Sequence, residues 1–177
     1  MKNIRRQQGF TIVEVLVSAF VFSIIAIVVS GLFIQILALE RRAFASQKIQ
    51  ENGLFIMELM SREIRVSQIQ NQDSPNCTAT SLTIIHPVNG TITYTLNAGV
   101  LQRTAVDPVT GVTTTTDLSS STVAFSRLNF CIMGSGATDH IQARVAILAS
   151  IQNKTGKDIL STSFETTVSS RDVQTEF

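Results

Sequence analysis

The chain has 177 residues, a length that predicts one domain, and its 14 basic and 13 acidic side chains leave a formal net charge of +1. A near-neutral chain has no global charge with which to coat a polyanion, and its 44% hydrophobic content excludes disorder over most of its length. Two cysteines cannot build a disulfide-dense scaffold or a four-cysteine metal site. Mean hydropathy is +0.26, which is high for a soluble domain, so the apolar residues either form an unusually large core or are concentrated in one segment.

The apolar residues are concentrated near the N-terminus. Residues 1–9 carry three basic side chains and no acidic one, and Glu14 is the only charged residue between positions 10 and 39. The stretch 15–39 has neither charge nor proline, and as a helix it spans about 38 Å, more than the ~30 Å hydrocarbon core of a bilayer. The sequence therefore predicts a transmembrane helix over 10–39, with the basic leader 1–9 on the cytoplasmic side and the rest of the chain across the membrane.

Two other interpretations of this segment are weaker. A cleaved secretory signal has an apolar region of only about 7–15 residues, much shorter than this one. An ordinary single-pass anchor fits the length, but it explains neither Glu14 nor the junction between Gly9 and Phe10.

Residues 40–71 predict a continuation of the helix outside the membrane. The stretch contains no proline and is rich in helix formers, and Glu58 and Arg62 make a favourable pair four residues apart. One narrow stripe recurs at intervals of three and four residues: Ile49, Gly53, Ile56, Met60 and Ile64. We expect this stripe to pack on a globular head, and Gly31 and Gly53 to be weak points of the helix.

Residues 72–177 predict a β-rich head. The segment 73–76 is expected to end the helix, and 13 threonines among residues 78–122 favour strands. An Asn-Gly turn at 89–90 predicts a hairpin, and the threonine run 113–116 predicts a loop or an edge strand. Strands are predicted at 81–87, 91–96, 100–104, 122–130, 141–151 and 159–168.

The head carries no recognisable catalytic or metal-binding motif. His86 and His140 have no cysteine or histidine at ligand spacing, and Asp107 and Asp139 are isolated, so we expect neither a zinc nor a calcium site. No nucleophile motif surrounds any serine, and the Gly-Ser-Gly at 134–136 lacks the flanking context of a phosphate loop. We therefore expect no enzyme activity, no catalytic residue and no cofactor. A local patch that binds DNA stays an open alternative, although nucleic acid is an unlikely partner for so neutral a chain.

The junction at the start of the apolar run resembles a known processing signal. The sequence QGFTIVEV at positions 8–15, behind a basic leader and ahead of an unbroken apolar helix, is similar to the type III signal of type IV prepilins and type II secretion pseudopilins. The resemblance implies that prepilin peptidase cleaves after Gly9 and that Phe10 becomes an N-methylated terminus. It also implies that Glu14 pairs with the new α-amine, in a neighbouring subunit when a fibre grows.

Two weaker similarities point to a subtype. The helix segment 50–65 resembles that of PilW-like minor pilins and J-type pseudopilins, and the end 168–172 is similar to the last strand of minor pilins, although Asp172 replaces an asparagine. The implied fold is α+β, a type IV pilin-like lollipop with one helix over about 10–70 packed on an antiparallel head at 72–177.

The resemblance also implies a function. We expect a minor pilin of the bacterial inner membrane with a periplasmic head, which primes or caps fibre assembly. Its partners are other pilins or pseudopilins, prepilin peptidase, the inner-membrane assembly platform and, before assembly, membrane lipid. A type II secretion pseudopilin is the close alternative, and an uncleaved membrane-anchored periplasmic binding module is an alternative of another class.

Cys77 and Cys131 are the only cysteines, and both follow the membrane helix. In an oxidising periplasm they are expected to form a disulfide, which would close a loop of about 55 residues and contribute roughly 4 kcal/mol through loop entropy. Two buried free thiols are the alternative.

Overall fold

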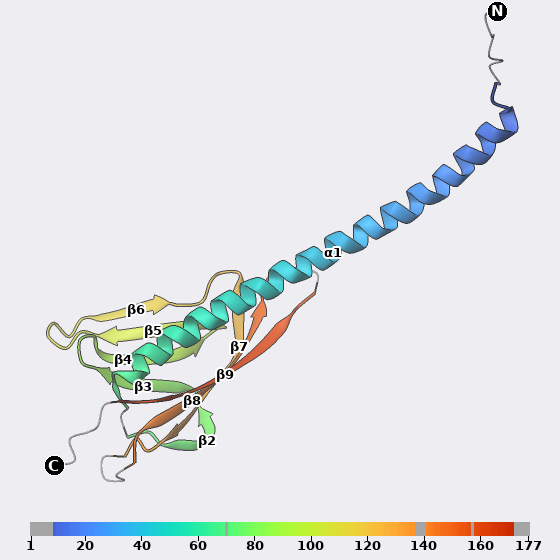
Figure 1. Ribbon diagram of the computed structural model, residues 1–177. Coiled ribbons are helices and arrows are strands. Elements are labelled where there is room, and N and C mark those ends of the chain that lie inside the picture. Colours follow the sequence, from blue (N-terminus) through green and yellow to red (C-terminus); the bar gives the residue numbers. More distant parts are fainter. Residues whose placement is uncertain (1–8, 70, 137–140, 157, 172–177) are drawn as a thin grey trace, which may run out of the picture. The chain divides into compact units, whose positions relative to one another are not determined.

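The structure is a computed structural model, which describes residues 9–69, 71–136, 141–156 and 158–171 (Figure 1). Contacts divide the chain into two compact units, Met1–Ala43 and Phe44–Phe177, and the helix α1, Ile12–Arg65, runs through the boundary between them. In the first unit, α1 is the only regular element among the described residues. The second unit contains the remainder of α1 and all of the strands, so the predicted α+β class is confirmed.

Helix α1 is continuous over 54 residues. Gly31 and Gly53, which the sequence marked as weak points, both lie inside it without a break. Its C-terminal end falls at Arg65, not near residue 70, and Gln68–Ile69 forms the short strand β1 instead. Because β1 pairs with β3 and buries Ile69, strand pairing overrides the helix propensity of the segment after Arg65.

The strands form two antiparallel sheets, labelled in Figure 1. The five-stranded sheet has the order β1-β3-β4-β5-β6, with β3 at Ser81–His86, β4 at Gly90–Asn97, β5 at Val100–Val106 and β6 at Thr113–Asp117. The four-stranded sheet has the order β2-β7-β8-β9, with β2 at Ser74–Ala79, β7 at Val123–Met133, β8 at Arg144–Asn153 and β9 at Ser161–Ser169.

Most of the predicted strands are confirmed. The segments predicted at 81–87, 91–96 and 100–104 form β3, β4 and β5, which pair in sequence order. Those predicted at 122–130, 141–151 and 159–168 correspond to β7, β8 and β9, and the threonine run is the edge strand β6. The prediction that the segment 73–76 ends the helix is wrong, because α1 already ends at Arg65 and Ser74 begins β2, which pairs with β7. The proline and asparagine in this segment gave no strand signal, and its pairing depends on a neighbour more than 50 residues away along the chain.

Threonine side chains line the face of the five-stranded sheet that points away from the core. Thr83, Thr93, Thr104 and Thr115 lie opposite one another across β3, β4, β5 and β6. Hydroxyl contacts of 3.2 Å and 3.1 Å join Thr83 to Thr93 and Thr104 to Thr115. The alternate residues of β3 and β4, such as Leu82, are buried, so the threonine-rich segments are strands with one polar and one core face.

The core lies between the C-terminal part of α1 and both sheets (Figure 1). The predicted stripe is confirmed, because its five residues are all buried and Met57 joins them. Gly53 meets the ring of Phe164 in β9, where a Cβ would come within 2.4 Å of the ring. Because Gly53 has no side chain, the four-stranded sheet can lie close to α1.

A charged cluster joins α1 to the five-stranded sheet. Arg103 of β5 donates to Glu63 of α1 at 2.9 Å and 3.1 Å, and the Tyr94 hydroxyl also donates to Glu63. Only 18% of each charged side chain is exposed. Burial, and next the Glu63 carboxylate, raise the pKa of Tyr94, while its hydrogen bond to Glu63 raises the pKa of Arg103. Tyr94 therefore stays protonated and Arg103 stays charged around neutral pH.

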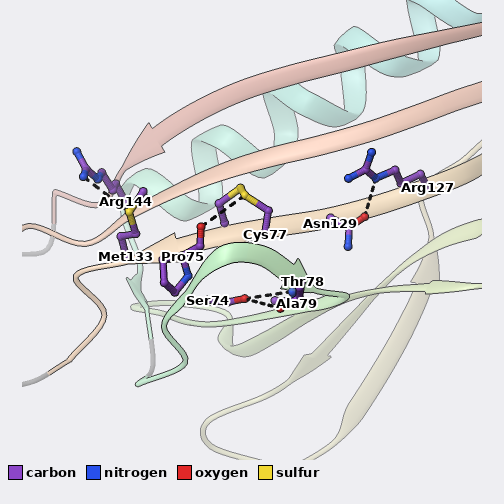
Figure 2. The surroundings of a disulfide bond; sticks show 10 residues. Ser74, Pro75, Cys77, Thr78, Ala79, Arg127, Asn129, Met133 and Arg144 are labelled. Atoms are coloured by element: carbon purple, nitrogen blue, oxygen red, sulfur yellow. Dashed lines mark hydrogen bonds between the residues drawn. A yellow bond between two sulfur atoms is a disulfide. The ribbon is translucent and has the colours of Figure 1, made fainter.

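A disulfide joins β2 to β7 (Figure 2). Cys77 and Cys131 are bonded with an S–S distance of 1.94 Å, so the bridge expected from the two cysteines is present in the structure. Beside it, Asp73 accepts hydrogen bonds from the hydroxyl of Ser135 at 2.6 Å and from its N–H at 2.9 Å. These bonds, the hydroxyl first, lower the pKa of Asp73. The 134–136 segment thus holds the residue that precedes β2.

Candidate functional site

Gly9 and Phe10 lie just before α1, separated from it by Thr11, and are exposed. A Cβ at Gly9 would meet nothing within 4 Å, so no packing within the described chain requires glycine there. Phe10 exposes 83% of its side chain, an unfavourable arrangement for a phenylalanine in water. Gly9 and Phe10 are therefore accessible to another molecule. A glycine without packing contacts and an exposed phenylalanine are better explained by recognition by another protein than by a role in folding.

Thr11 caps the N-terminus of α1. The Glu14 N–H donates to the Thr11 carbonyl at 3.1 Å and to its hydroxyl at 3.3 Å, and the Val15 N–H donates to the same carbonyl at 3.2 Å. Thr-x-x-Glu is the sequence of a capping box, with threonine at the N-cap and glutamate at the third helical position. Sequence reasoning singled out Glu14 but missed Thr11, although this four-residue pattern was the signal that identifies it.

Glu14 stands in the first turn of the helix with its carboxylate exposed. The positive end of the helix dipole favours a carboxylate at this position. No described cation forms an ion pair with it, so the only charge of the apolar run has local helix contacts and no counter-ion among the described residues. The geometry leaves this carboxylate accessible to an amine supplied at the same level, whether by its own terminus or by another molecule.

Between Val15 and Leu39 the helix carries no charge and is predominantly apolar around its whole circumference. All residues from Gly9 to Ile36 are exposed, and α1 is long and apolar enough to cross a membrane. Large side chains point outward around the whole circumference, among them Phe20, Phe22, Ile27, Phe33 and Ile34. A helix of this kind requires lipid or other apolar helices around it.

The described residues of the second unit form no arrangement that resembles a reactive centre. Within the described residues, no group of three histidine, cysteine, aspartate or glutamate side chains is placed to hold a metal ion. Asp107 accepts bonds from the N–H groups of Thr110 and Val109, at 2.7 Å and 2.8 Å, which lower its pKa and close a local turn. His86 accepts from two backbone N–H groups, whereas His140, Asp139 and Asp172 lie outside the described residues.

Comparison with known proteins identifies the N-terminal segment. The family model of the prokaryotic N-terminal methylation motif, which is the type IV prepilin signature, matches residues 4–30. No curated protein and no solved structure matches the chain. The matched motif is a structural one, typical of pilin-like and pseudopilin chains, and does not define an enzyme family. Cleavage after Gly9, methylation of Phe10 and pairing of Glu14 stay predictions.

Proposed function

We propose that this chain, which carries the type IV prepilin signature at residues 4–30, is a minor pilin that helps to prime or cap a fibre. In this role it is not an enzyme. It waits in the bacterial inner membrane with residues 1–9 in the cytoplasm and the second unit in the periplasm. Prepilin peptidase removes residues 1–9, and the assembly platform then transfers the processed chain from lipid into a fibre with other pilins.

The observation that carries this proposal is the exposed apolar helix with one carboxylate at its start. The same surface that is stable against lipid is stable against the apolar helices of other subunits, so transfer from membrane to fibre exchanges one apolar environment for another. The head, by contrast, has its own core and needs neither environment.

Pairing of Glu14 with an α-amine would favour the fibre over the membrane. A carboxylate inside hydrocarbon costs roughly 2.5–3.5 kcal/mol at mid-membrane, and less near the interface. Cleavage after Gly9 would create an α-amine at Phe10, about one helical turn away, and a neighbour displaced along the fibre would present its amine at a similar depth. Pairing offsets the desolvation of both charges, whereas removal of one partner leaves the other stranded.

The test of processing is the intact mass of the protein extracted from membranes of the producing cells. We expect the mass of residues 10–177 plus one methyl group. The uncleaved mass would contradict the proposal and would favour a permanently anchored periplasmic binding module.

The test of assembly is Glu14→Gln, compared with Glu40→Gln, another exposed glutamate of α1 beyond the apolar run. Immunoblots of sheared fibre and membrane fractions should show a fibre signal reduced at least tenfold for Glu14→Gln and unchanged for Glu40→Gln. Cleavage should persist in both variants. Normal incorporation of Glu14→Gln would show that the carboxylate has no part in assembly.

A type II secretion pseudopilin is the second candidate, since the matched signature is shared by such chains. The two roles differ in the machinery that takes up the processed chain. Deletion of the pilus assembly ATPase should abolish fibre incorporation of a minor pilin. Incorporation that instead depends on the secretion ATPase would assign the chain to the secretion system.

A further inference from the structure

A hollow of about 460 Å³ opens in the second unit where α1 ends. It is lined by Arg65, Val66, Gln68, Ile85, Pro87 and Arg171. These residues come from three segments that are far apart in sequence: the end of α1 with β1, the end of β3, and the segment that follows β9. The hollow plays no part in the processing and assembly roles of the N-terminal segment.

Specific hydrogen bonds hold its walls together. The Arg171 N–H donates to the Arg65 carbonyl at 2.8 Å, and the Ser170 hydroxyl donates to the Ser67 carbonyl at 2.6 Å. On the other side, Gln68 lies opposite Ile85 in the β1–β3 ladder. The backbones that carry the two arginines are therefore joined directly, and the floor is a paired strand edge rather than a free loop.

The two arginines have no counter-charge among the described residues. The ion pairs of this part of the chain are made by other residues, Arg103 with Glu63 and Arg62 with Glu58, and no described carboxylate lines the hollow. Among the described residues, Arg65 and Arg171 thus bring two positive charges to the lining of one hollow, in a chain whose net charge is only +1. An anion between them would relieve their mutual repulsion and accept their forked N–H donors.

The rest of the lining is suited to an apolar body. Val66 and Ile85 are 49% and 38% exposed, and together with Pro87 they form the apolar part of the lining. The Gln68 amide adds one neutral donor and acceptor. The favourable position of a cation at a helix C-terminus explains Arg65 alone. It accounts neither for Arg171, which follows a strand, nor for the hollow.

We propose that this hollow binds a phosphate monoester carried on an apolar body. A phosphate monoester carries about −1.5 to −2 charges near neutral pH, which matches two arginines better than a single carboxylate does. The apolar wall receives the body of the ligand, and the two guanidinium groups fix the phosphate at its rim.

The test is calorimetric titration of the full chain in a non-ionic detergent with phenyl phosphate, inorganic phosphate and benzoate. We expect phenyl phosphate to bind several-fold more tightly than either other probe, because only it supplies both charge and apolar surface. Arg65→Gln and Arg171→Gln should each weaken phenyl phosphate binding about tenfold, since a hydrogen bond to a charged group is lost. Arg144→Gln, an equal loss of charge at an exposed site outside the hollow, should change it less than twofold.

Three results would overturn the site. These are no binding of phenyl phosphate at millimolar concentration, unchanged affinity in both hollow variants, or an equal loss in Arg144→Gln, which would indicate only general charge attraction. NMR spectra of the backbone amides would check that each variant keeps its fold. Because Arg171 lies outside α1, Arg171→Gln tests the site without altering the C-terminal end of that helix. The outcome does not depend on the mass or fibre assays, so the site and the assembly role can fail separately.

Discussion

The two parts of α1 belong to one continuous helix but meet different surroundings. From Val15 to Leu39 its side chains are uncharged, mostly apolar and nearly all exposed, whereas from Phe44 to Arg65 it buries one narrow stripe and keeps charges on its other sides. The more hydrophobic part is thus the less buried one within the chain. The hydrophobicity of a helix predicts that its surface must be buried. The periodicity of its apolar residues predicts whether one face packs on a folded domain or the whole circumference lies in an apolar medium.

Variants in the head should therefore change its unfolding and leave the N-terminal helix intact in detergent. Tyr94, the only tyrosine in a chain without tryptophan, lies in the head core, so its fluorescence reports the head alone. Helical circular dichroism in micelles reports mostly α1. Variants of the head can be ranked with these signals, from the largest expected effect to the smallest.

Removal of the disulfide should have the largest effect. The Cys77→Ser/Cys131→Ser double variant loses a link between residues 54 positions apart, which should lower the free energy of unfolding by about 4 kcal/mol. Urea unfolding followed at Tyr94 measures the loss, and reduction with alkylation of the unaltered protein should reproduce it. A head equally stable without the bond would show that the disulfide adds nothing to the core. A parallel loss of micelle helicity would contradict the independence of the two parts.

Glu63→Gln should come next. The change leaves Arg103 without its carboxylate in a site only 18% exposed, and should cost about 3 kcal/mol in the same urea assay. The matched control is Glu58→Gln on the same helix, whose pair with Arg62 is largely exposed and contributes less than about 0.5 kcal/mol. Equal effects of the two variants would mean that burial of the Glu63 cluster does not matter.

The two glycines of α1 compare its parts directly. Gly53→Ala places a Cβ against the Phe164 ring and should destabilise the head by about 1–2 kcal/mol, after the gain of roughly 1 kcal/mol in helix propensity. Gly31→Ala meets nothing within 4 Å and should leave unfolding at Tyr94 unchanged. A Phe164→Leu change added to Gly53→Ala should recover part of the loss. Stabilisation by Gly53→Ala would show that Phe164 moves aside without cost.

The smallest effect should appear at acid pH. Hydrogen bonds from Ser135 lower the pKa of Asp73 below its ordinary 3.8, so the unfolded chain takes up a proton before the folded one. The stability that these bonds contribute is present above about pH 3.8 and is lost as the pH falls through the lowered folded pKa. In a plot of the urea midpoint, followed by Tyr94 fluorescence, against pH, Ser135→Ala should make the fall at acid pH less steep. An unaltered limb would exclude Asp73 as its source.

The sequence by itself determined the N-terminal segment and the helix stripe. Both depend on short-range patterns: the prepilin signature and a run of apolar residues for the first, and a period of 3.6 for the second. Alternation and turn residues likewise determined β3, β4 and β5, because hairpin neighbours are close in sequence. Even the threonine cap of α1 was encoded locally, in the four residues from Thr11 to Glu14.

Only the tertiary structure decided the features that join distant segments. Arg65 ends α1 because β1 must pair with β3, and Ser74 begins β2 because β7 lies beside it. Glu63, Tyr94 and Arg103 gave no common signal, yet one helix and two strands bring their side chains together. The hollow also depends on tertiary structure, because its two arginines, Arg65 and Arg171, are more than 100 residues apart along the chain. Local patterns encode which way a segment folds, whereas its partner depends on the packing of the whole core, to which no short window of sequence has access.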